Sequence, residues 1–214
     1  MNNTTATRSS TRLLAAVALA CAAAAPVVAH AEAGPFMVRA RALYLDPANE
    51  STGALSTLGG VTVSSKYIWE IDASYFITPS IALELIATTP QKHRVYLGGT
   101  EIGTLRHLPP TLTLQYHFAP NNPTVQPYVG LGVNYTRFSA VNLNTALGKV
   151  TVEKKSWGLA YNVGADFPIT DSLYFNVDFK KIDIQTEATL EGVGKVGTVK
   201  VDPVVVGFGI GYRF

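Results

Sequence analysis

The feature that most constrains this chain is an alternation of apolar and other residues, repeated in segments of about ten residues. In the last segment, VVVGFGIGYRF, one face carries mainly glycine and Arg213, and the opposite face is wholly apolar: Val204, Val206, Phe208, Ile210, Tyr212 and Phe214. A period of two residues predicts a β-strand with one apolar face. A fold made of such strands must cover every apolar face with a second layer or with lipid.

Seven earlier segments repeat this alternation, so the sequence predicts eight strands. We expect them at residues 36–45, 67–77, 81–88, 111–118, 129–135, 156–167, 173–180 and 204–214. After the seventh segment the apolar residues change parity, because Ile182 and Ile184 follow odd-numbered apolar positions. This change predicts a β-bulge at Lys180-Lys181.

The connections between these segments alternate between short and long. Residues 78–80, 119–126 and 168–172 are short and rich in Pro, Asn, Asp and Ser, as turns are. The long connections are residues 46–66, 89–110, 139–155 and 187–202. Four long loops argue against a compact soluble domain. Short turns on the periplasmic side and long loops outside are typical of an outer-membrane barrel.

The distribution of aromatic and charged residues indicates which solvent the apolar face meets. A soluble β-sandwich also alternates, but here aromatic residues gather at the strand ends, as in the two girdles of a membrane barrel. The opposite faces carry charges that suit a barrel lumen: Arg39, Arg41, Glu70, Asp72, Glu84, Asp178 and Arg213. The sequence therefore predicts an all-β fold, an eight-stranded antiparallel transmembrane β-barrel of the outer-membrane type with four long extracellular loops.

The first 31 residues have the pattern of a cleaved secretory signal peptide. Arg8 and Arg12 precede an apolar run at 13–25, and Ala29-His30-Ala31 forms a small-residue cleavage site. Cys21 in ALAC also faintly resembles a lipoprotein cleavage box. Residues 32–214 are then the barrel, and because the signal removes two of the 17 basic residues and none of the 15 acidic ones, the barrel has no net charge. This balance excludes the basic surface that a nucleic-acid partner requires.

Several stretches, taken together and in order, resemble the outer membrane protein W family, including its alkane-uptake branch. They are FMVRARALYLDP, IALELIATTPQKHRV, LRHLPPTLTLQYHF, QPYVGLGVNYTRF, SWGLAYNVGADFPI, IDIQTEA and VDPVVVGFGIGYRF. Val204 departs from the family, which often has Trp there, and so do the lysines of FKKIDI. The resemblance implies a bacterial outer-membrane location, outer-membrane lipid around the wall, and barrel-assembly machinery and periplasmic chaperones as partners during biogenesis. Tyr212 and Phe214 resemble the C-terminal assembly signal.

The same resemblance implies passive uptake of small hydrophobic solutes, which enter an apolar funnel among the outer loops and leave sideways into the bilayer. Two long loops offer candidate lining residues: Leu55, Leu58, Val61, Val63, Val95, Tyr96, Leu97, Ile102, Leu105 and Leu108. Pro109 and Pro110 cannot donate hydrogen bonds to a β-ladder, so a gap there is a candidate lateral exit. Alternatively, these apolar residues only pack the loops together.

Other functions find less support in the sequence. An eight-stranded interior is roughly filled by side chains, which argues against a wide pore. We expect Arg39, Arg41 and Arg213 to pair with the lumen carboxylates in a structural plug, and a polar conduction path is the alternative. No Ser-His-acid set can be assembled, GVGKVG is followed by no helix, and the histidines lack metal-ligand spacing, so we expect no enzyme, metal or cofactor. The main alternative is a structural or adhesive barrel whose loops bind external partners.

Overall fold

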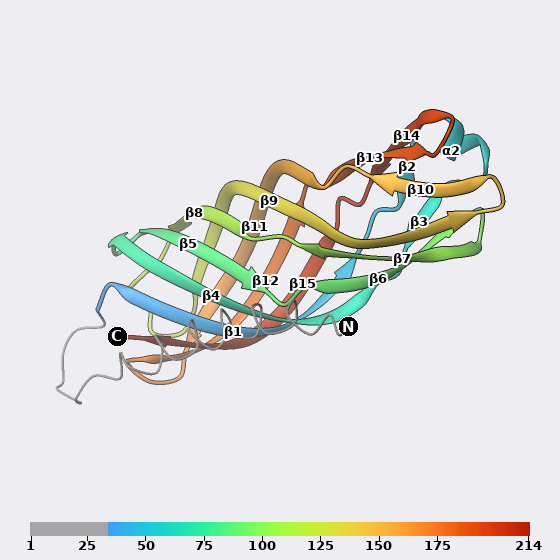
Figure 1. Ribbon diagram of the computed structural model, residues 1–214. Coiled ribbons are helices and arrows are strands. Elements are labelled where there is room, and N and C mark those ends of the chain that lie inside the picture. The colour runs from blue at the N-terminus through green and yellow to red at the C-terminus, as the bar shows by residue number, and fades with distance from the viewer. Residues whose placement is uncertain (1–33) are drawn as a thin grey trace, which may run out of the picture. The chain divides into compact units, whose positions relative to one another are not determined.

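The computed structural model describes residues 34–214, so the predicted signal peptide lies outside the described residues. Eight antiparallel strands form a closed barrel (Figure 1). They are β1 (Phe36–Asp46), β4 (Lys66–Thr78), β5 (Ile81–Thr88), β8 (Thr111–His117), β9 (Gln126–Thr145), β11 (Lys155–Pro168), β12 (Leu173–Ile182) and β15 (Val204–Arg213). No helix among the described residues is long and apolar enough to cross a membrane.

The barrel closes between its first and last strands. β1 pairs with β4 on one side and with β15 on the other, in a register that joins Val38 to Tyr212. The pairing continues to the end of the strand, where the Phe214 amide donates to the Phe36 carbonyl at 2.8 Å. The Phe36 and Phe214 rings stack with centroids 6.2 Å apart. β9 and β11 also pair with each other, which completes the ring of eight strands, so none of these strands is left as an edge.

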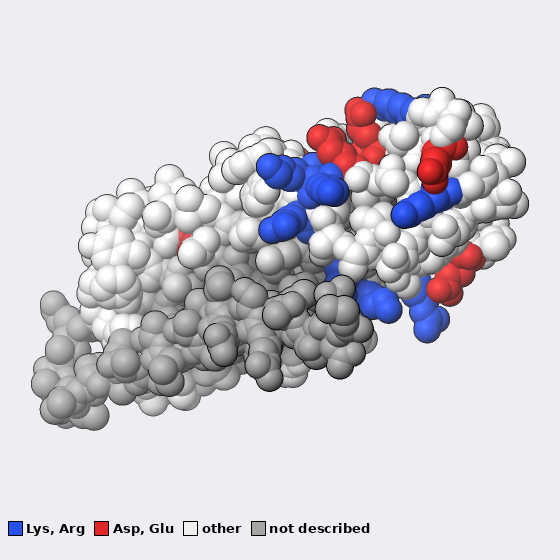
Figure 2. Space-filling model, in the orientation of Figure 1, with Lys and Arg blue, Asp and Glu red and all other residues white. Residues whose placement is uncertain are grey.

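The alternation in the sequence corresponds to an outer apolar face and an inner polar face. Trp69 and Leu131 on the outer face are 71% and 56% exposed, whereas Arg39 and Glu84 on the inner face are completely buried. Aromatic pairs lie at both ends of the wall, such as Tyr135 with Trp157 at a centroid distance of 4.8 Å. In Figure 2 charged side chains gather over the long-loop end, and the visible wall is almost uncharged. This surface fits lipid.

The long loops are not irregular, because they continue the sheet beyond the barrel. We call this part the extension. Its elements are β2 (Glu50–Ser51), α2 (Ala54–Thr57), β3 (Val61–Val63), β6 (Gln91–Leu97), β7 (Thr100–Leu108), β10 (Gly148–Val152), β13 (Gln185–Leu190), β14 (Gly194–Lys200) and the last residues of β9. β7 and β10 both pair with β9, β10 continues through β13 and β14 to β2, and β6 joins β7 to β3. The extension continues from one end of the barrel (Figure 1), and its buried apolar side chains form a core of their own.

The expected bulge at Lys180-Lys181 is absent. β12 pairs with β11 without a register shift, from Asn162 opposite Lys180 to Ala160 opposite Ile182. Ile182 is buried on the same inner face as Lys180. The change of parity in the sequence therefore reflects a change in the chemistry of the interior from charged to apolar, and not a change in backbone phase.

The glycine-rich inner face of β15 makes room for the side chains of β1. Gly209 lies opposite Arg41 and Gly211 opposite Arg39. A Cβ atom on Gly209 would come within 2.1 Å of the Ala40 carbonyl oxygen and 2.7 Å of the Arg41 Cα atom. The bare face of the last strand is thus occupied by the two arginine stems from the first strand.

Candidate functional site: an apolar chamber above a charged lumen

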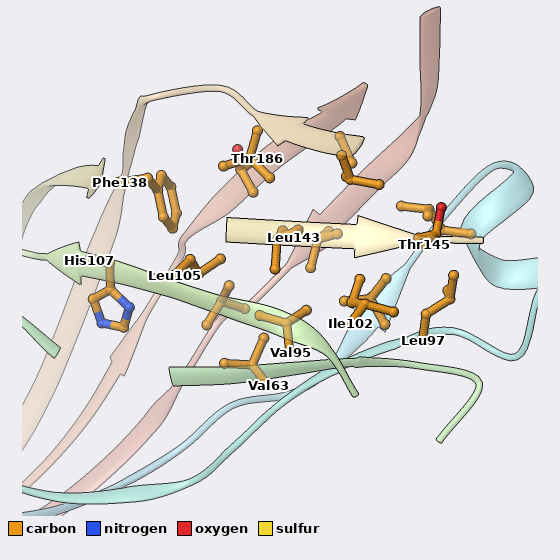
Figure 3. Close-up of a pocket in the computed structure, with 17 residues that line it drawn as sticks. Val63, Val95, Leu97, Ile102, Leu105, His107, Phe138, Leu143, Thr145 and Thr186 are labelled. Atoms are coloured by element: carbon orange, nitrogen blue, oxygen red, sulfur yellow. The ribbon is translucent and has the colours of Figure 1, made fainter. Parts of the chain in front are cut away.

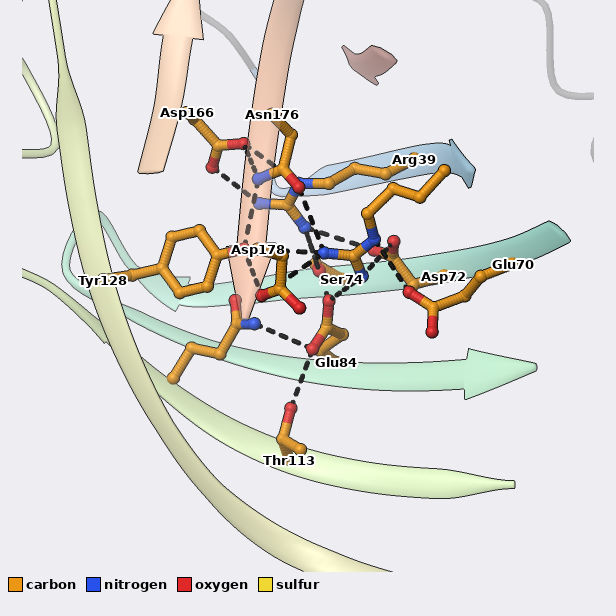
Figure 4. A network of polar contacts seen from close by, with 12 residues as sticks. Arg39, Glu70, Asp72, Ser74, Glu84, Thr113, Tyr128, Asp166, Asn176 and Asp178 are labelled. Carbon is orange, nitrogen blue, oxygen red and sulfur yellow. Dashed lines mark hydrogen bonds and ion pairs between the residues drawn. The ribbon is translucent and has the colours of Figure 1, made fainter. Parts of the chain in front are cut away.

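The barrel interior contains a buried network of charged side chains, which we call the lumen cluster (Figure 4). Its members come from β1, β4, β5, β11 and β12, and each is at most 3% exposed: Arg39, Arg41, Glu70, Asp72, Glu84, Asp166, Asp178 and Lys180. Because alternate residues of neighbouring strands point inward, these side chains meet on the barrel axis.

Arg39 holds one half of the lumen cluster together. Its guanidinium donates to both carboxylate oxygens of Asp166, at 3.1 and 2.7 Å, in a bidentate pair. It also donates to Asp72 at 3.2 Å and to the Ser74 hydroxyl at 2.9 Å. Every side of this planar cation therefore faces an acceptor, as the burial of a charge requires.

Arg41 contacts four carboxylates of the same cluster. Its nitrogens lie 2.8 Å from Glu70, 2.6 Å from Asp72, 2.8 Å from Glu84 and 3.6 Å from Asp178. Arg41 is thus the cation on which most of the buried negative charge converges.

Lys180 and neutral donors complete the lumen cluster. The Lys180 ammonium lies 2.9 Å from Glu70 and 2.5 Å from Asp178. Gln115 donates to Glu84 at 2.7 Å, and the Tyr128 hydroxyl donates to Asp178 at 2.7 Å. This network fills the lumen with paired charges, which argues against a wide aqueous path along the barrel axis.

The lumen cluster contains six of the seven charges expected from the sequence, together with two that were missed. Asp166 and Lys180 lie on the inner parity of their strands, so the alternation could have identified them. Arg213 differs from the expectation, since none of the ion pairs found within residues 34–214 includes it. Arg213 lies at the end of β15, where its guanidinium is 4.0 Å from the Phe76 ring centroid and donates to the Gly34 carbonyl at 2.8 Å.

The extension encloses an apolar chamber with a free volume of about 40 Å³ (Figure 3). Strands from all four long loops contribute to its lining: Leu55, Val61, Val63, Val95, Leu97, Ile102, Leu105, His107, Phe138, Leu143, Thr145, Val150, Val152, Thr186, Ala188, Val199 and Val201. A free volume of this size corresponds to roughly three water-sized spheres. A solute larger than about three water molecules must therefore displace side chains to occupy the chamber.

Most of the predicted funnel residues line this chamber, and three do not. Leu55, Val61, Val63, Val95, Leu97, Ile102 and Leu105 are in the lining. Leu58 follows helix α2 and is 53% exposed, because Leu55 is the residue that α2 buries. Tyr96 and Leu108 are only partly buried and alternate with lining residues along β6 and β7. The missed residues are His107 on β7 and those in 138–152 and 186–201, where Leu143, Val150, Val152 and Val199 follow a period of two.

Two stacked histidines lie at one end of the chamber. The His93 and His107 rings are nearly parallel, at 9°, with centroids 4.8 Å apart. His93 Nδ1 lies 2.7 Å from the Ser64 carbonyl oxygen, so Nδ1 carries the proton that it donates. The Nε2 atoms of both rings are buried and have no hydrogen-bond partner.

Both imidazoles are held in the neutral form by their surroundings. Burial lowers the pKa of His93, and the charge of Lys66 acts in the same direction. Burial lowers the pKa of His107 to about 3, with smaller contributions from His93 and Lys66. The end of the chamber is therefore polar but uncharged at neutral pH.

The β-ladder is interrupted at the two prolines between the barrel and the extension. β5 and β8 pair as far as Ile86 opposite Thr111, and pairing resumes only at Gln91 opposite His107. The carbonyls of Pro109 and Pro110 accept hydrogen bonds from the side-chain amide of Asn134 on β9, at 3.2 Å each. These bonds lie on the side of the prolines that faces β9. The gap therefore faces the β5–β6 connection.

A second discontinuity lies between β11 and the loop that joins β12 to β13. The part of β11 before Ala160 pairs with β9 but not with β12. A hollow of about 430 Å³ is found there, lined by Trp157, Gly158, Leu159, Asp183, Ile184, Gln185, Lys200 and Asp202. Charged and amide side chains make this hollow more polar than the chamber.

Within residues 34–214, no group of three or more His, Cys, Asp or Glu side chains is arranged to hold a metal ion. The carboxylates of the lumen cluster are instead paired with arginine and lysine, as described above. The arrangement thus offers a closed polar lumen, an apolar chamber above it and two interruptions in the wall between them.

Comparisons with known proteins place this architecture in one family. The model of the OmpW family matches residues 32–214. Outer membrane protein W of Vibrio cholerae is 36% identical over 209 residues, which cover 92% of this chain and 95% of that protein. The dibenzothiophene metabolism operon protein PahQ of Pseudomonas aeruginosa is 29% identical over 163 residues, covering 73% of this chain and 75% of that protein.

A solved structure agrees with these matches. The crystal structure of the outer membrane protein OprG from Pseudomonas aeruginosa superposes with a TM-score of 0.75 at 33% identity, and covers 86% of this chain and 97% of that chain. Outer membrane protein W and OprG are both named as proteins of the outer membrane. The chain belongs to the OmpW family and is an outer-membrane β-barrel protein.

Proposed function

We propose that this barrel provides passive uptake of small hydrophobic molecules across the outer membrane. The observation that carries the proposal is the apolar chamber in the extension, which lies above a lumen closed by paired charges. Apolar solutes gain free energy by leaving water for the chamber, at about 25 cal/mol per Å² of surface buried.

The lumen cluster supports a sideways route for these solutes. An apolar molecule that continued along the axis would have to separate Arg41 from the carboxylates it contacts, and breaking one such buried pair costs about 3–5 kcal/mol. A lateral step into the hydrocarbon of the bilayer has no comparable cost. The solute would therefore leave through the wall between the chamber and the lumen cluster.

The interruption at Pro109 and Pro110 is the better candidate for the exit. It requires no ladder hydrogen bond to break, because prolines have no N–H to donate. The hollow beside Trp157 is the alternative, but Asp183, Lys200 and Asp202 line it, and an apolar solute would gain less there. The prolines also directly follow β7, whose Leu105 and His107 belong to the chamber lining.

The name of one relative is consistent with this proposal. PahQ is named for an operon of dibenzothiophene metabolism, and dibenzothiophene is a small apolar aromatic compound. The main rival function is a surface platform whose loops bind external molecules. The apolar interior of the extension favours transport, because a platform needs only an outer surface.

The test is the influx of labelled toluene into cells that carry this barrel in their outer membrane. The control is an unrelated eight-stranded barrel at equal abundance. We expect faster influx with this protein, and equal influx with a folded, inserted barrel would refute transport and favour the platform.

Two glutamate substitutions then locate the path. Leu105→Glu places a carboxylate in the chamber and should abolish the added influx, whereas Leu58→Glu puts the same charge on an exposed position and should leave it unchanged. Val95→Phe narrows the chamber without adding charge and should also reduce influx. Equal influx through Leu105→Glu and Leu58→Glu barrels, both shown to be folded, would exclude the chamber as the path.

A further inference from the structure

His107 is the lining residue of the chamber whose polar group is not used by the protein. The lining also contains two hydroxyl groups, but both are engaged: Thr145 Oγ1 donates to the Gly148 carbonyl at 3.0 Å, and Thr186 Oγ1 donates to the Glu153 carbonyl at 3.0 Å. In contrast, His107 Nε2 is buried without a hydrogen-bond partner. A buried polar atom left in this state lowers stability and calls for an explanation.

The packing around His107 holds its ring in place without satisfying the nitrogen. One face stacks on His93, and the ring meets the edge of Phe138 at a centroid distance of 6.3 Å and an interplanar angle of 70°. His93 cannot supply a hydrogen bond, since its proton is on Nδ1 and is donated to the Ser64 carbonyl. The ring is therefore fixed beside the chamber with an unpaired nitrogen (Figure 3).

We infer that the chamber selects small apolar molecules that carry one hydroxyl group, which hydrogen-bonds to the His107 imidazole while the apolar part contacts the aliphatic lining. A hydroxyl both donates and accepts, so it fits either neutral tautomer of the imidazole. A molecule with several polar groups would leave the others unpaired among Leu105, Leu143 and Val199. Alkanols and phenols meet this requirement, and ionised solutes do not.

This inference rests on the proposed function only for its consequence in transport, because binding in the chamber is measurable without influx. Phenol and toluene are the matched probes, since they differ by a hydroxyl in place of a methyl group. The protein is labelled with ¹⁵N-histidine and inserted in nanodiscs of phosphatidylcholine, and the imidazole shifts are recorded while each probe is added. His117, which is buried and lies outside the chamber lining, serves as the internal reference.

We expect phenol to shift the imidazole nitrogen resonances of His107 while toluene does not, and His117 to remain unchanged. In the His107→Leu variant the affinity for phenol relative to toluene should fall at least fivefold, roughly the loss of one hydrogen bond to a buried group. His107→Phe, which keeps an aromatic ring beside Phe138, should show the same loss. An equal response of His107 to phenol and toluene in the wild-type barrel, or an unchanged affinity ratio in both variants, overturns the inference.

The two proposals fail in different ways. If toluene influx depends on the barrel but phenol leaves His107 unshifted, transport stands and the hydroxyl site is wrong. If phenol shifts His107 but neither probe enters faster with the barrel, the site stands and the transport function is wrong.

Discussion

Replacing Arg41 by methionine removes the cation that contacts the most carboxylates in the lumen cluster. The wild-type cluster has three cations, Arg39, Arg41 and Lys180, and five carboxylates. Without Arg41, Glu84 keeps only a 3.8 Å contact to Arg39 among its ion pairs, in addition to its hydrogen bonds to Thr113 and Gln115. We therefore expect Arg41→Met to lower the free energy of unfolding by about 3–5 kcal/mol, the cost of leaving a buried charge without its partner.

Urea unfolding of the barrel in phosphatidylcholine vesicles measures this loss, with the fluorescence of Trp69 and Trp157 on the outer wall as the signal. Arg137 lies on β9 with its side chain exposed, so Arg137→Met is the matched control and should cost less than about 0.5 kcal/mol. Adding Glu84→Gln to Arg41→Met should restore part of the loss, because it neutralises a carboxylate that no longer has a close cation. A loss under about 1 kcal/mol for Arg41→Met, similar to the control, would refute the view that these pairs close the lumen.

Three further predictions concern the closure, the chamber and the wall. Gly209→Ala should lower stability by about 2 kcal/mol or more in the same urea assay, because the new Cβ would lie 2.1 Å from a backbone oxygen and crowd Arg41. The pKa of His107 is lowered to about 3 in the folded protein, so the unfolded extension binds more protons below pH 6.5, and its stability should fall by about 1.4 kcal/mol per unit from pH 6.5 toward pH 3. Protease cleavage of the loops should therefore be faster at pH 4.5 than at pH 6.5, and the increase should be smaller in His107→Leu. Equal cleavage at pH 4.5 and pH 6.5 would contradict the neutral imidazole. Replacing Pro109 and Pro110 by alanine should permit ladder hydrogen bonds and slow toluene influx, and unchanged influx would direct attention to the other interruption of the wall.

The barrel itself was predictable because its strands carry two independent signals. The period of two separates outer Trp69 from inner Glu70, and aromatic residues such as Tyr135 and Trp157 mark where the wall meets the interface. The same alternation assigned Arg39 and Arg41 to the lumen, next to the glycines of β15. Both signals are local, and closure of the sheet follows from them.

The extension was harder to predict, because its strands are short and interrupted. β6 and β7 change register beside Gly103, whose φ is 140°, so the alternation breaks where the hairpin bends. The apolar parity of Ile182 and Ile184 predicts a bulge, whereas both residues are buried in the apolar core of the extension and neither is in the chamber lining. No local pattern tells whether an inner face meets charges or a cavity, since this depends on strands far away in sequence.

The stacking of His93 on His107 shows the same limit. The two residues are neighbours only because β6 and β7 form a hairpin, with His93 opposite Leu105 and Gln91 opposite His107. The sequence gives each residue a place in a long loop, but the unpaired nitrogens follow from the packing of Phe138 and Ser64 around the rings. Such a site is found from the structure and not from spacing.

Methyl-resolved NMR of the barrel in nanodiscs, titrated with toluene, tests the central claim most directly. The claim is that apolar solutes occupy the chamber before they reach the bilayer. It predicts saturable shifts at Leu105, Leu143 and Val199 in the chamber, together with the gradual, non-saturating response of lipid-facing Leu131 as toluene enters the lipid. If Leu131 responds while the chamber methyl groups remain unchanged, toluene reaches the bilayer without passing through the chamber, and the account is contradicted.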